Sequence, residues 1–261
     1  MTFFTQFGEA MTADDRTPVT RICGYDADSI SLRGKDLIAD VIGQYSFTGA
    51  FLLQALGTPP SKRQVELVDA VLVTIMEHGL VPSVVASRLT FHGAPDSIQG
   101  AVAAGLLGVG DRYAGTAGRC GEVAESLLAT KDMDAGAAAL VADYRSRKQP
   151  VPGFGHPIHT GRDPRVDKLL GMVDAESAPR RAMLALEVAI SEALGRPLVM
   201  NVSAVLAVLM LEAGIPSQMM RGVVLIARCA SLVGHIYEES HSPVGDALWR
   251  GAEDAVGYSE D

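Results

Sequence analysis

A histidine in a turn rich in proline and glycine is the strongest chemical signal in this sequence. His156 stands between Gly155 and Pro157 in the stretch VPGFGHPIHTGRDPR, residues 151–165. Glycine lets backbone N–H groups approach a ligand closely, and proline holds a loop in one shape. A histidine, with an ordinary pKa of about 6.5, suits proton transfer to or from a substrate oxygen. We therefore predict that His156 is catalytic; the plainer alternative is a histidine on a surface loop.

Three arginines have settings that suit an anionic ligand. Arg162 and Arg165 lie in GRDPR, where Pro164 suits the first turn of a helix. A guanidinium binds a carboxylate through two parallel hydrogen bonds, so arginines beside a proton-transfer histidine indicate a polycarboxylate substrate. Simple charge at a helix start is the alternative. Arg228 interrupts the apolar run VVLIARCASLVG, and a buried arginine is costly unless it meets an anion, either a ligand or a structural partner.

His78 and Arg250 carry weaker signals. His78 is expected in the last turn of a helix that ends at Gly79, where the helix dipole favours a cation whether or not a ligand binds. Arg250 lies in ALWRG near the end of the chain. Solvent exposure is the default there, and an arm that reaches a neighbouring subunit is the alternative.

Composition excludes several classes of protein. The 261 residues are 48% hydrophobic and 20% charged, so the chain can bury a sizeable core. A net charge of −9 argues against a nucleic-acid surface, which needs a basic patch. The three cysteines form no CxxC pair, so neither a disulfide framework nor a zinc site is indicated. The start lacks a signal-peptide pattern, and the apolar segment AVLAVLML is too short to span a bilayer. We expect a soluble, cytoplasmic protein that binds no membrane.

The elements that must position these residues are predicted to be helices. A short extended or turn segment from Gly24 precedes a helix that starts near Gly34, and Ser61 with Gln64 has the spacing of a capping box. Helical patterns follow on both sides of HGAP, before Pro150, and over 164–173, 178–194 and about 202–213. The stretch that begins at IPSQMM is long and apolar on most faces, which predicts a buried central helix. No stretch alternates convincingly as a strand, so we predict an all-α fold.

Taken in this order, the site residues resemble the citrate synthase superfamily. The resemblance runs from about Gly24 to Arg250, and PGFGH…DPR is its most specific motif. EHG, AVAAG, MNV and IAR fall at appropriate intervals. RGKDL, EHGLVPS and GLLGVGDRYAG are similar to the citryl-CoA lyase branch, which includes the C-terminal lyase module of ATP-citrate lyase, rather than to a true synthase.

This resemblance implies an architecture and a set of partners. After a loose N-terminal arm over 1–20, residues 21–115 and 215–261 would form a large helical domain. Residues 116–214 would form a smaller domain that closes over a thioester. The family resemblance also implies a homodimer, and no cofactor or metal beyond the coenzyme A of the substrate.

The resemblance assigns roles to the candidate residues. His156 would hydrogen-bond the reacting oxygen of oxaloacetate or the citryl group, and His78 would contact the same dicarboxylate. Arg165 and Arg228 would bind carboxylates, and Arg250 would do so from the partner subunit. The coenzyme A chain would pass Phe154, Gly155 and Arg162.

Two departures from the synthase pattern bear on the reaction. Ala114 occupies the place of the histidine that stabilises the thioester enolate, and this favours cleavage over synthesis. Ser203 in MNVSAVL replaces the aspartate that moves a proton at the acetyl methyl group. The first hypothesis is a lyase that cleaves citryl-CoA, or a similar 3-hydroxy polycarboxylyl-CoA, by a retro-Claisen step. The alternatives are a catalytically impaired binding protein and a lyase for a different acyl-CoA.

Overall fold

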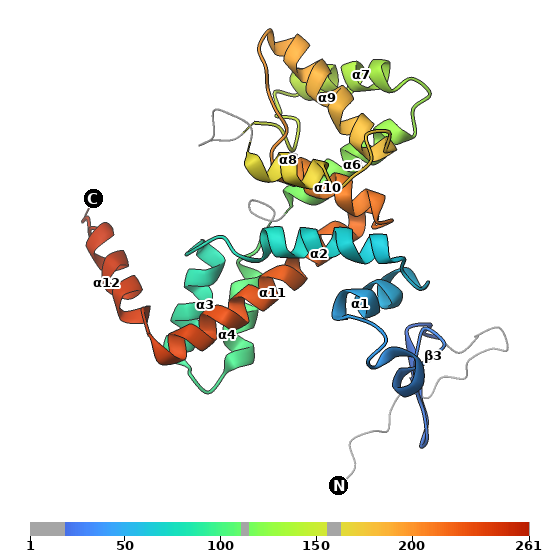
Figure 1. Ribbon diagram of the computed structural model, residues 1–261. Helices are drawn as coiled ribbons and strands as arrows, with labels where there is room; N and C mark the ends of the chain where they lie inside the picture. The colour runs from blue at the N-terminus through green and yellow to red at the C-terminus, as the bar shows by residue number, and fades with distance from the viewer. Residues whose placement is uncertain (1–18, 111–114, 156–162, 261) are drawn as a thin grey trace, which may run out of the picture. The chain divides into compact units, whose positions relative to one another are not determined.

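The computed structural model describes residues 19–110, 115–155 and 163–260 (Figure 1). Most of these residues are helical, which confirms the predicted class. The chain divides into two compact units, residues 1–60 and 61–261. The predicted domains, residues 21–115 with 215–261 and residues 116–214, remain a prediction.

The shorter unit contains three short strands that the sequence analysis did not identify. They are β1 (Cys23–Tyr25), β2 (Ile30–Leu32) and β3 (Lys35–Asp36), paired antiparallel in that order and followed by the helices η1 (Leu37–Val41) and α1 (Phe47–Leu56). The helix predicted to start near Gly34 begins at Leu37 instead. Arg33 and Gly34 have φ values of 50° and 77° and make the tight turn between β2 and β3, a conformation that a helix does not allow.

Helices make up the longer unit. Their bounds are α2 (Lys62–Met76), α3 (Pro82–Gly93), α4 (Ile98–Leu107), α6 (Thr116–Leu128), α7 (Met133–Ser146), α8 (Pro164–Leu170), α9 (Ala178–Leu194), α10 (Val202–Glu212), α11 (Ser217–His241) and α12 (Gly245–Ala255). The predicted break near HGAP separates α3 from α4, and the predicted patterns match α8, α9 and α10. Helix α12, which carries Arg250, was not predicted.

Helix α2 begins as predicted and ends earlier. Ser61 Oγ accepts a hydrogen bond from Gln64 N at 3.2 Å, and Gln64 Oε1 accepts one from Ser61 N at 2.9 Å, which completes the capping box. The last helical residue is Met76, because Glu77 is extended at φ −118° and ψ 142°. The prediction that His78 lies in the last turn of this helix was therefore wrong, and His78 lies in the turn that follows.

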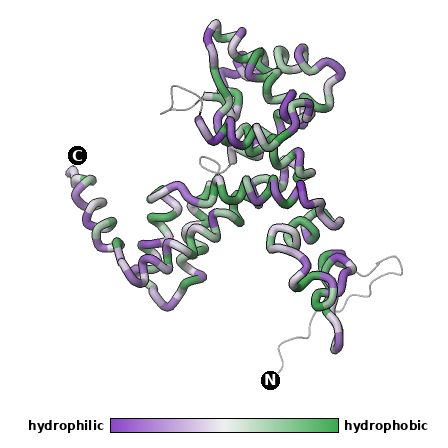
Figure 2. Tube along the Cα trace, in the orientation of Figure 1, coloured by the Kyte–Doolittle hydropathy of each residue, from purple (hydrophilic) through white to green (hydrophobic). Residues whose placement is uncertain are grey.

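The most deeply buried helix is α10 and not α11. Seven consecutive residues of α10, 204–210, are buried, so this helix is enclosed on all sides. Helix α11 is long and apolar enough to cross a membrane, but it packs against α2, α3, α4 and α6 as a core helix does. Polar and apolar residues alternate along its length (Figure 2), and Val233 and Tyr237 are exposed. The predicted buried central helix is therefore central in its packing, but it is buried only in part.

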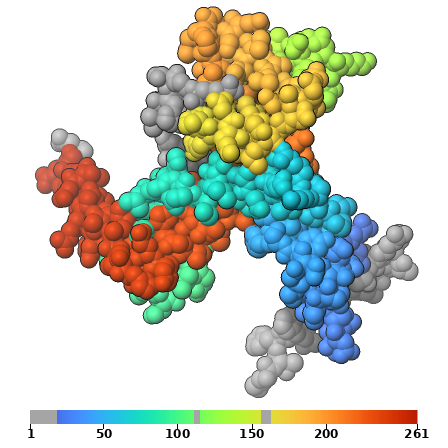
Figure 3. Space-filling view, viewed as in Figure 1, coloured from blue at the N-terminus to red at the C-terminus, as the bar shows by residue number. Residues whose placement is uncertain are grey.

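The packing of α11 brings distant parts of the chain together. Helices α2 and α11 lie side by side (Figures 1 and 3), and α6 contacts both α10 and α11. Small residues allow the close approach: a Cβ on Gly121 in α6 would lie 2.6 Å from Met220 Sδ in α11. The end of α2 and the starts of α6 and α10 therefore surround one place beside α11.

Candidate active site

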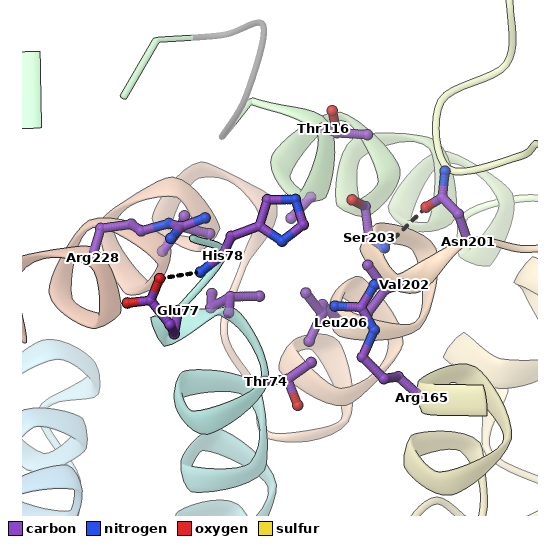
Figure 4. A pocket seen from close by; sticks show the side chains of 13 residues that line it. Thr74, Glu77, His78, Thr116, Arg165, Asn201, Val202, Ser203, Leu206 and Arg228 are labelled. Atoms are coloured by element: carbon purple, nitrogen blue, oxygen red, sulfur yellow. Dashed lines mark hydrogen bonds between the residues drawn. The ribbon is translucent and has the colours of Figure 1, made fainter. Parts of the chain in front are cut away.

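A pocket of about 210 Å³ lies where these helix ends meet (Figure 4). Four of the predicted site residues, His78, Arg165, Ser203 and Arg228, line it together. They come from the turn after α2 and from α8, α10 and α11, which are far apart in the sequence. The other lining residues are Thr74, Ile75, Glu77, Thr116, Ala117, Asn201, Val202, Leu206 and Val224.

The turn that presents His78 is held by the carboxylate before it. Glu77 Oε1 accepts hydrogen bonds from His78 N at 2.8 Å and Gly79 N at 2.6 Å. Gly79 has a φ of +70°, a conformation that glycine adopts without strain. The His78 imidazole extends toward the middle of the pocket (Figure 4).

Glu77 carries an ionised carboxylate whose two oxygens are both hydrogen-bonded to neighbouring groups. Its Oε2 accepts hydrogen bonds from Ser231 Oγ at 2.8 Å and lies 3.0 Å from His235 Nε2. Partial burial alone would raise the pKa of this carboxyl. Hydrogen bonds from Ser231 and from the two backbone N–H groups, with the attraction to His235, outweigh burial and lower the pKa to about 2. A carboxylate with so low a pKa is a poor proton acceptor. Glu77 is therefore better suited to holding the turn and supplying a negative charge than to acting as a general base.

Arg228 is the cation in the pocket that lacks a carboxylate partner among the described residues. Its Nη1 donates to Met76 O, at the end of α2, at 3.3 Å. Burial lowers the pKa of its guanidinium, and the charge of Glu77 acts in the opposite direction. A guanidinium so placed can accept an anionic ligand with little rearrangement.

Arg165, in contrast, is already paired. Its Nη2 lies 2.7 Å from Asp163 Oδ2, and its Nε lies 3.1 Å from both oxygens of that buried carboxylate. These hydrogen bonds raise the pKa of Arg165, against the effect of burial. Asp163 also caps α8 by accepting from Arg165 N at 2.9 Å. Figure 4 shows Arg165 at the pocket, and its pairing with Asp163 holds the guanidinium there for a ligand carboxylate.

Asn201 joins the motif loop to the start of α10. Its Oδ1 accepts from Ser203 N at 2.9 Å, its backbone N donates to Gly153 O at 2.9 Å, and its Nδ2 donates to Gly155 O at 3.1 Å. The loop is thereby fixed against α10, and Ser203 faces the pocket (Figure 4). Asn201 and Glu77 were not among the predicted site residues. An asparagine directly before an apolar helix and an acid directly before the histidine are the signals that could have identified them.

The remaining predicted residues lie elsewhere or outside the described part of the chain. His156, Arg162 and Ala114 fall outside the described residues. Phe154 and Gly155 lead into that region, and Phe154 pairs with Met200 through an isolated bridge. Arg250 is exposed on α12 and does not line the pocket of this chain.

Within the part of the chain that the structure describes, no group of three or more histidine, cysteine, aspartate or glutamate residues is arranged to hold a metal ion. The polar groups that line this pocket are an imidazole, two guanidinium groups, three hydroxyls, one side-chain amide and an ionised carboxylate.

Comparison with known proteins identifies the family. The family model described as "Citrate synthase, C-terminal domain" matches residues 22–251. The chain belongs to the citrate synthase family. This confirms the family resemblance found in the motifs, and the family region contains every lining residue of the pocket.

Solved structures relate this citrate synthase family member to lyases. It is similar to the citryl-CoA lyase from Hydrogenobacter thermophilus, with a TM-score of 0.82 and 28% identity over 94% of this chain and 96% of that one. It also shares the fold of an ATP citrate lyase from Methanothrix soehngenii in complex with citrate and coenzyme A. The TM-score is 0.74, at 19% identity, and the match covers 96% of this chain and 43% of that one.

Curated relatives are named as synthases. The citrate synthase of Haloferax volcanii is 27% identical over 72% of this chain and 50% of its own length. Putative citrate synthase 2 of Mycobacterium tuberculosis is 28% identical over 74% of this chain and 52% of its own length. The chain thus spans about half the length of the curated relatives it matches.

Proposed function

We propose that this protein cleaves citryl-CoA, or a similar 3-hydroxy polycarboxylyl-CoA, to acetyl-CoA and oxaloacetate. The observation that carries the proposal is the convergence of His78, Arg165, Arg228 and Ser203 on one pocket. The similarity to a citryl-CoA lyase over nearly the full length of both chains supports it.

In the proposed reaction, the arginines hold the carboxylates of the substrate. The hydroxyl proton passes to a histidine, and the C–O bond becomes a ketone as the C–C bond breaks. The electron pair of that bond moves into the thioester enolate, which takes a proton at carbon to give acetyl-CoA. His156 and His78 are the proposed partners of the hydroxyl that becomes the ketone. No metal is required, because the thioester carbonyl accepts the negative charge.

The polar end of the substrate would occupy the pocket and the coenzyme A chain would lie outside it. A volume of about 210 Å³ is below the usual range of roughly 300–1,000 Å³ for drug-sized ligands, and it suits a small polycarboxylate group. We assign the coenzyme A chain to Phe154, Gly155 and Arg162. A homodimer would bring Arg250 of one subunit to the pocket of the other.

Ser203 favours a second candidate function. An ordinary serine hydroxyl is not a general base at neutral pH, and general acid–base help is worth about 10²–10⁴-fold. A protein that binds the thioester without cleaving it is the alternative. A lyase for a different acyl-CoA, whose own carboxyl group assists the proton transfer, is a further one.

One experiment separates a citryl-CoA lyase from a binding protein. Purified protein is mixed with citryl-CoA, and acetyl-CoA and oxaloacetate are followed by mass spectrometry beside the His156→Ala and Ser203→Asp variants. We expect turnover in the natural protein and its loss in His156→Ala. Turnover that appears only in Ser203→Asp, with saturable binding in the natural protein, would establish a binding protein. Cleavage that survives in His156→Ala would contradict the assigned role of the loop histidine.

A further inference from the structure

The carboxylate that holds the His78 turn belongs to a chain of polar contacts that leaves the pocket. Glu77 Oε2 lies 3.0 Å from His235 Nε2. On the other side of the ring, His235 Nδ1 lies 2.8 Å from Arg88 Nη2 and 3.2 Å from Arg88 Nε. Arg88 is in α3 and His235 is in α11, so the contacts join two helices to the turn after α2.

These contacts define the tautomer of His235. The guanidinium nitrogens of Arg88 can only donate, so His235 Nδ1 must accept. With Nδ1 accepting, the proton on Nε2 is donated to Glu77 Oε2. The histidine therefore links Arg88 to the carboxylate of Glu77 through hydrogen bonds on both sides of its ring.

Arg88 is itself anchored at the far end of the chain of contacts. It is 2% exposed, and its Nη1 lies 2.6 Å from Glu239 Oε2; Glu238 also pairs with Arg88. The other oxygen of Glu239 accepts from the N–H groups of Val244 and Gly245 at 3.0 and 2.7 Å. Val244 is the N-cap residue of α12 and makes no capping hydrogen bond with its side chain, and Gly245 is the first residue of the helix.

A buried ion pair contributes little net stability compared with apolar packing of the same volume, because its charges lose their hydration. Its directional hydrogen bonds do fix the groups that it joins. The hydrogen bonds that join Glu77, His235, Arg88 and Glu239 are therefore suited to fixing two backbone segments. One is the turn that presents His78, and the other is the start of α12.

We propose that Glu77, His235, Arg88 and Glu239 form a positioning relay, which sets the His78 turn at the pocket and the start of the helix that carries Arg250. Of these four residues only Glu77 lines the pocket, and the relay acts by holding the turn that presents His78. Its effect on ligand binding rests on the proposed function, whereas its effect on the turn does not.

The first test needs no ligand. Hydrogen exchange is measured at the amides of His78 and Gly79 in the natural protein and in His235→Leu. The same change six residues later in α11, His241→Leu, is the matched control, because His241 is exposed and outside the relay. We expect exchange at the turn to rise about tenfold in His235→Leu and to stay unchanged in the control. Unchanged exchange at the turn, or an equal rise throughout α2, would overturn the relay.

Glu77→Gln provides a second variant that keeps the size of the side chain. Either its amide nitrogen faces the donors at Ser231 and His235, or it faces the two backbone N–H groups, so one set of hydrogen bonds is lost. We expect faster exchange at the turn, with Glu66→Gln on the exposed face of α2 as the control. If the two residues act in one relay, adding His235→Leu to Glu77→Gln changes the exchange rate little.

The second test separates positioning from general destabilisation. Binding of oxaloacetate and of coenzyme A is measured by calorimetry for the natural protein and each variant. We expect the dissociation constant for oxaloacetate to rise about tenfold and that for coenzyme A to stay unchanged. Equal weakening of both ligands would show a merely structural role and overturn the proposal. Failure of the natural protein to bind either ligand would contradict the proposed function, and the exchange experiment would still decide the relay.

Discussion

Arg228 illustrates how a single residue can signal a ligand. The side chain interrupts an apolar helix and is half-buried, and within the described residues its guanidinium donates a hydrogen bond to a carbonyl oxygen at the end of α2. Burial lowers the pKa of its guanidinium, so the site stabilises the charge poorly when no anion is bound. Arg228 is therefore better suited to binding an anionic ligand than to stabilising the folded protein.

This difference gives a prediction for Arg228→Met. We expect the free energy of unfolding to change by no more than about 0.5 kcal/mol, because an unpaired charge is removed and the apolar stem is kept. We expect the affinity for oxaloacetate to fall at least tenfold, since a charge-assisted hydrogen bond is lost. Urea unfolding and calorimetry measure the two effects, and Arg63→Met on the exposed face of α2 is the control. A large loss of stability would instead indicate a structural arginine.

Glu77 gives a prediction for the dependence of stability on pH. Its pKa is about 2 in the folded protein and 4.5 as an ordinary carboxyl, so ionisation stabilises the fold above pH 4.5. This contribution is lost as the pH falls from 4.5 toward 2, because the unfolded chain takes up the proton first. The natural protein should be more stable than Glu77→Gln at pH 7, and the difference should shrink in that window. Urea unfolding at a series of pH values checks it; a difference independent of pH would contradict the low pKa.

At the scale of elements, the short loop over 153–155 is held by backbone contacts that depend on glycine. Gly153 is buried and has a φ of +89°. A Cβ there would lie 2.6 Å from Cys120 Sγ in α6 and 2.9 Å from Ala204 Cβ in α10. The loop can thus lie directly on two helices, which brings residues 153–155 next to the start of α10.

We expect Gly153→Ala to destabilise the protein by about 1–3 kcal/mol more than a glycine substitution without a clash. Gly195→Ala is the matched control, because Gly195 has a φ of +65° with no atom within 4 Å of a Cβ. Both changes carry the backbone strain, and only the first adds overpacking. Urea unfolding of both variants gives the comparison. Equal losses would show that the contact of this loop with α6 and α10 is loose.

At the scale of the whole molecule, the proposed homodimer predicts complementation between inactive variants. Arg250 is exposed on α12, away from the pocket lining of its own chain. If it acts in the partner's site, Arg250→Ala and Arg228→Met subunits mixed after dissociation form heterodimers with one complete site.

When equal amounts of the two variants pair at random, half of the dimers are heterodimers, and each has one complete site of two. The mixture should therefore recover about a quarter of the natural activity. Turnover of citryl-CoA, with oxaloacetate binding as a second readout, measures the recovery. If Arg250 served the site of its own chain, neither site of the heterodimer would be complete and nothing would be recovered. A monomer in sedimentation experiments would also rule out this use of Arg250.

Local patterns in the sequence were sufficient to predict where several helices of the fold begin. Ser61 and Gln64 start α2 because a capping box involves residues three apart, and Pro164 starts α8 because its ring suits the first helical turn. The motif spacing also identified the family and four residues of the pocket. Short-range interactions and a family motif are both contained in neighbouring residues, so they can be predicted from the sequence.

Other features depend on residues that meet only after folding. Helix α2 ends at Met76 because Ser231 and His235, about 150 residues away, hold the carboxylate of Glu77 in an extended turn. The burial of α10 and the partial exposure of α11 likewise follow from which helices pack around each, although both sequences are apolar. Periodicity shows that a helix has an apolar face, but the neighbours that cover it are set by tertiary packing, and so is the relay behind His78.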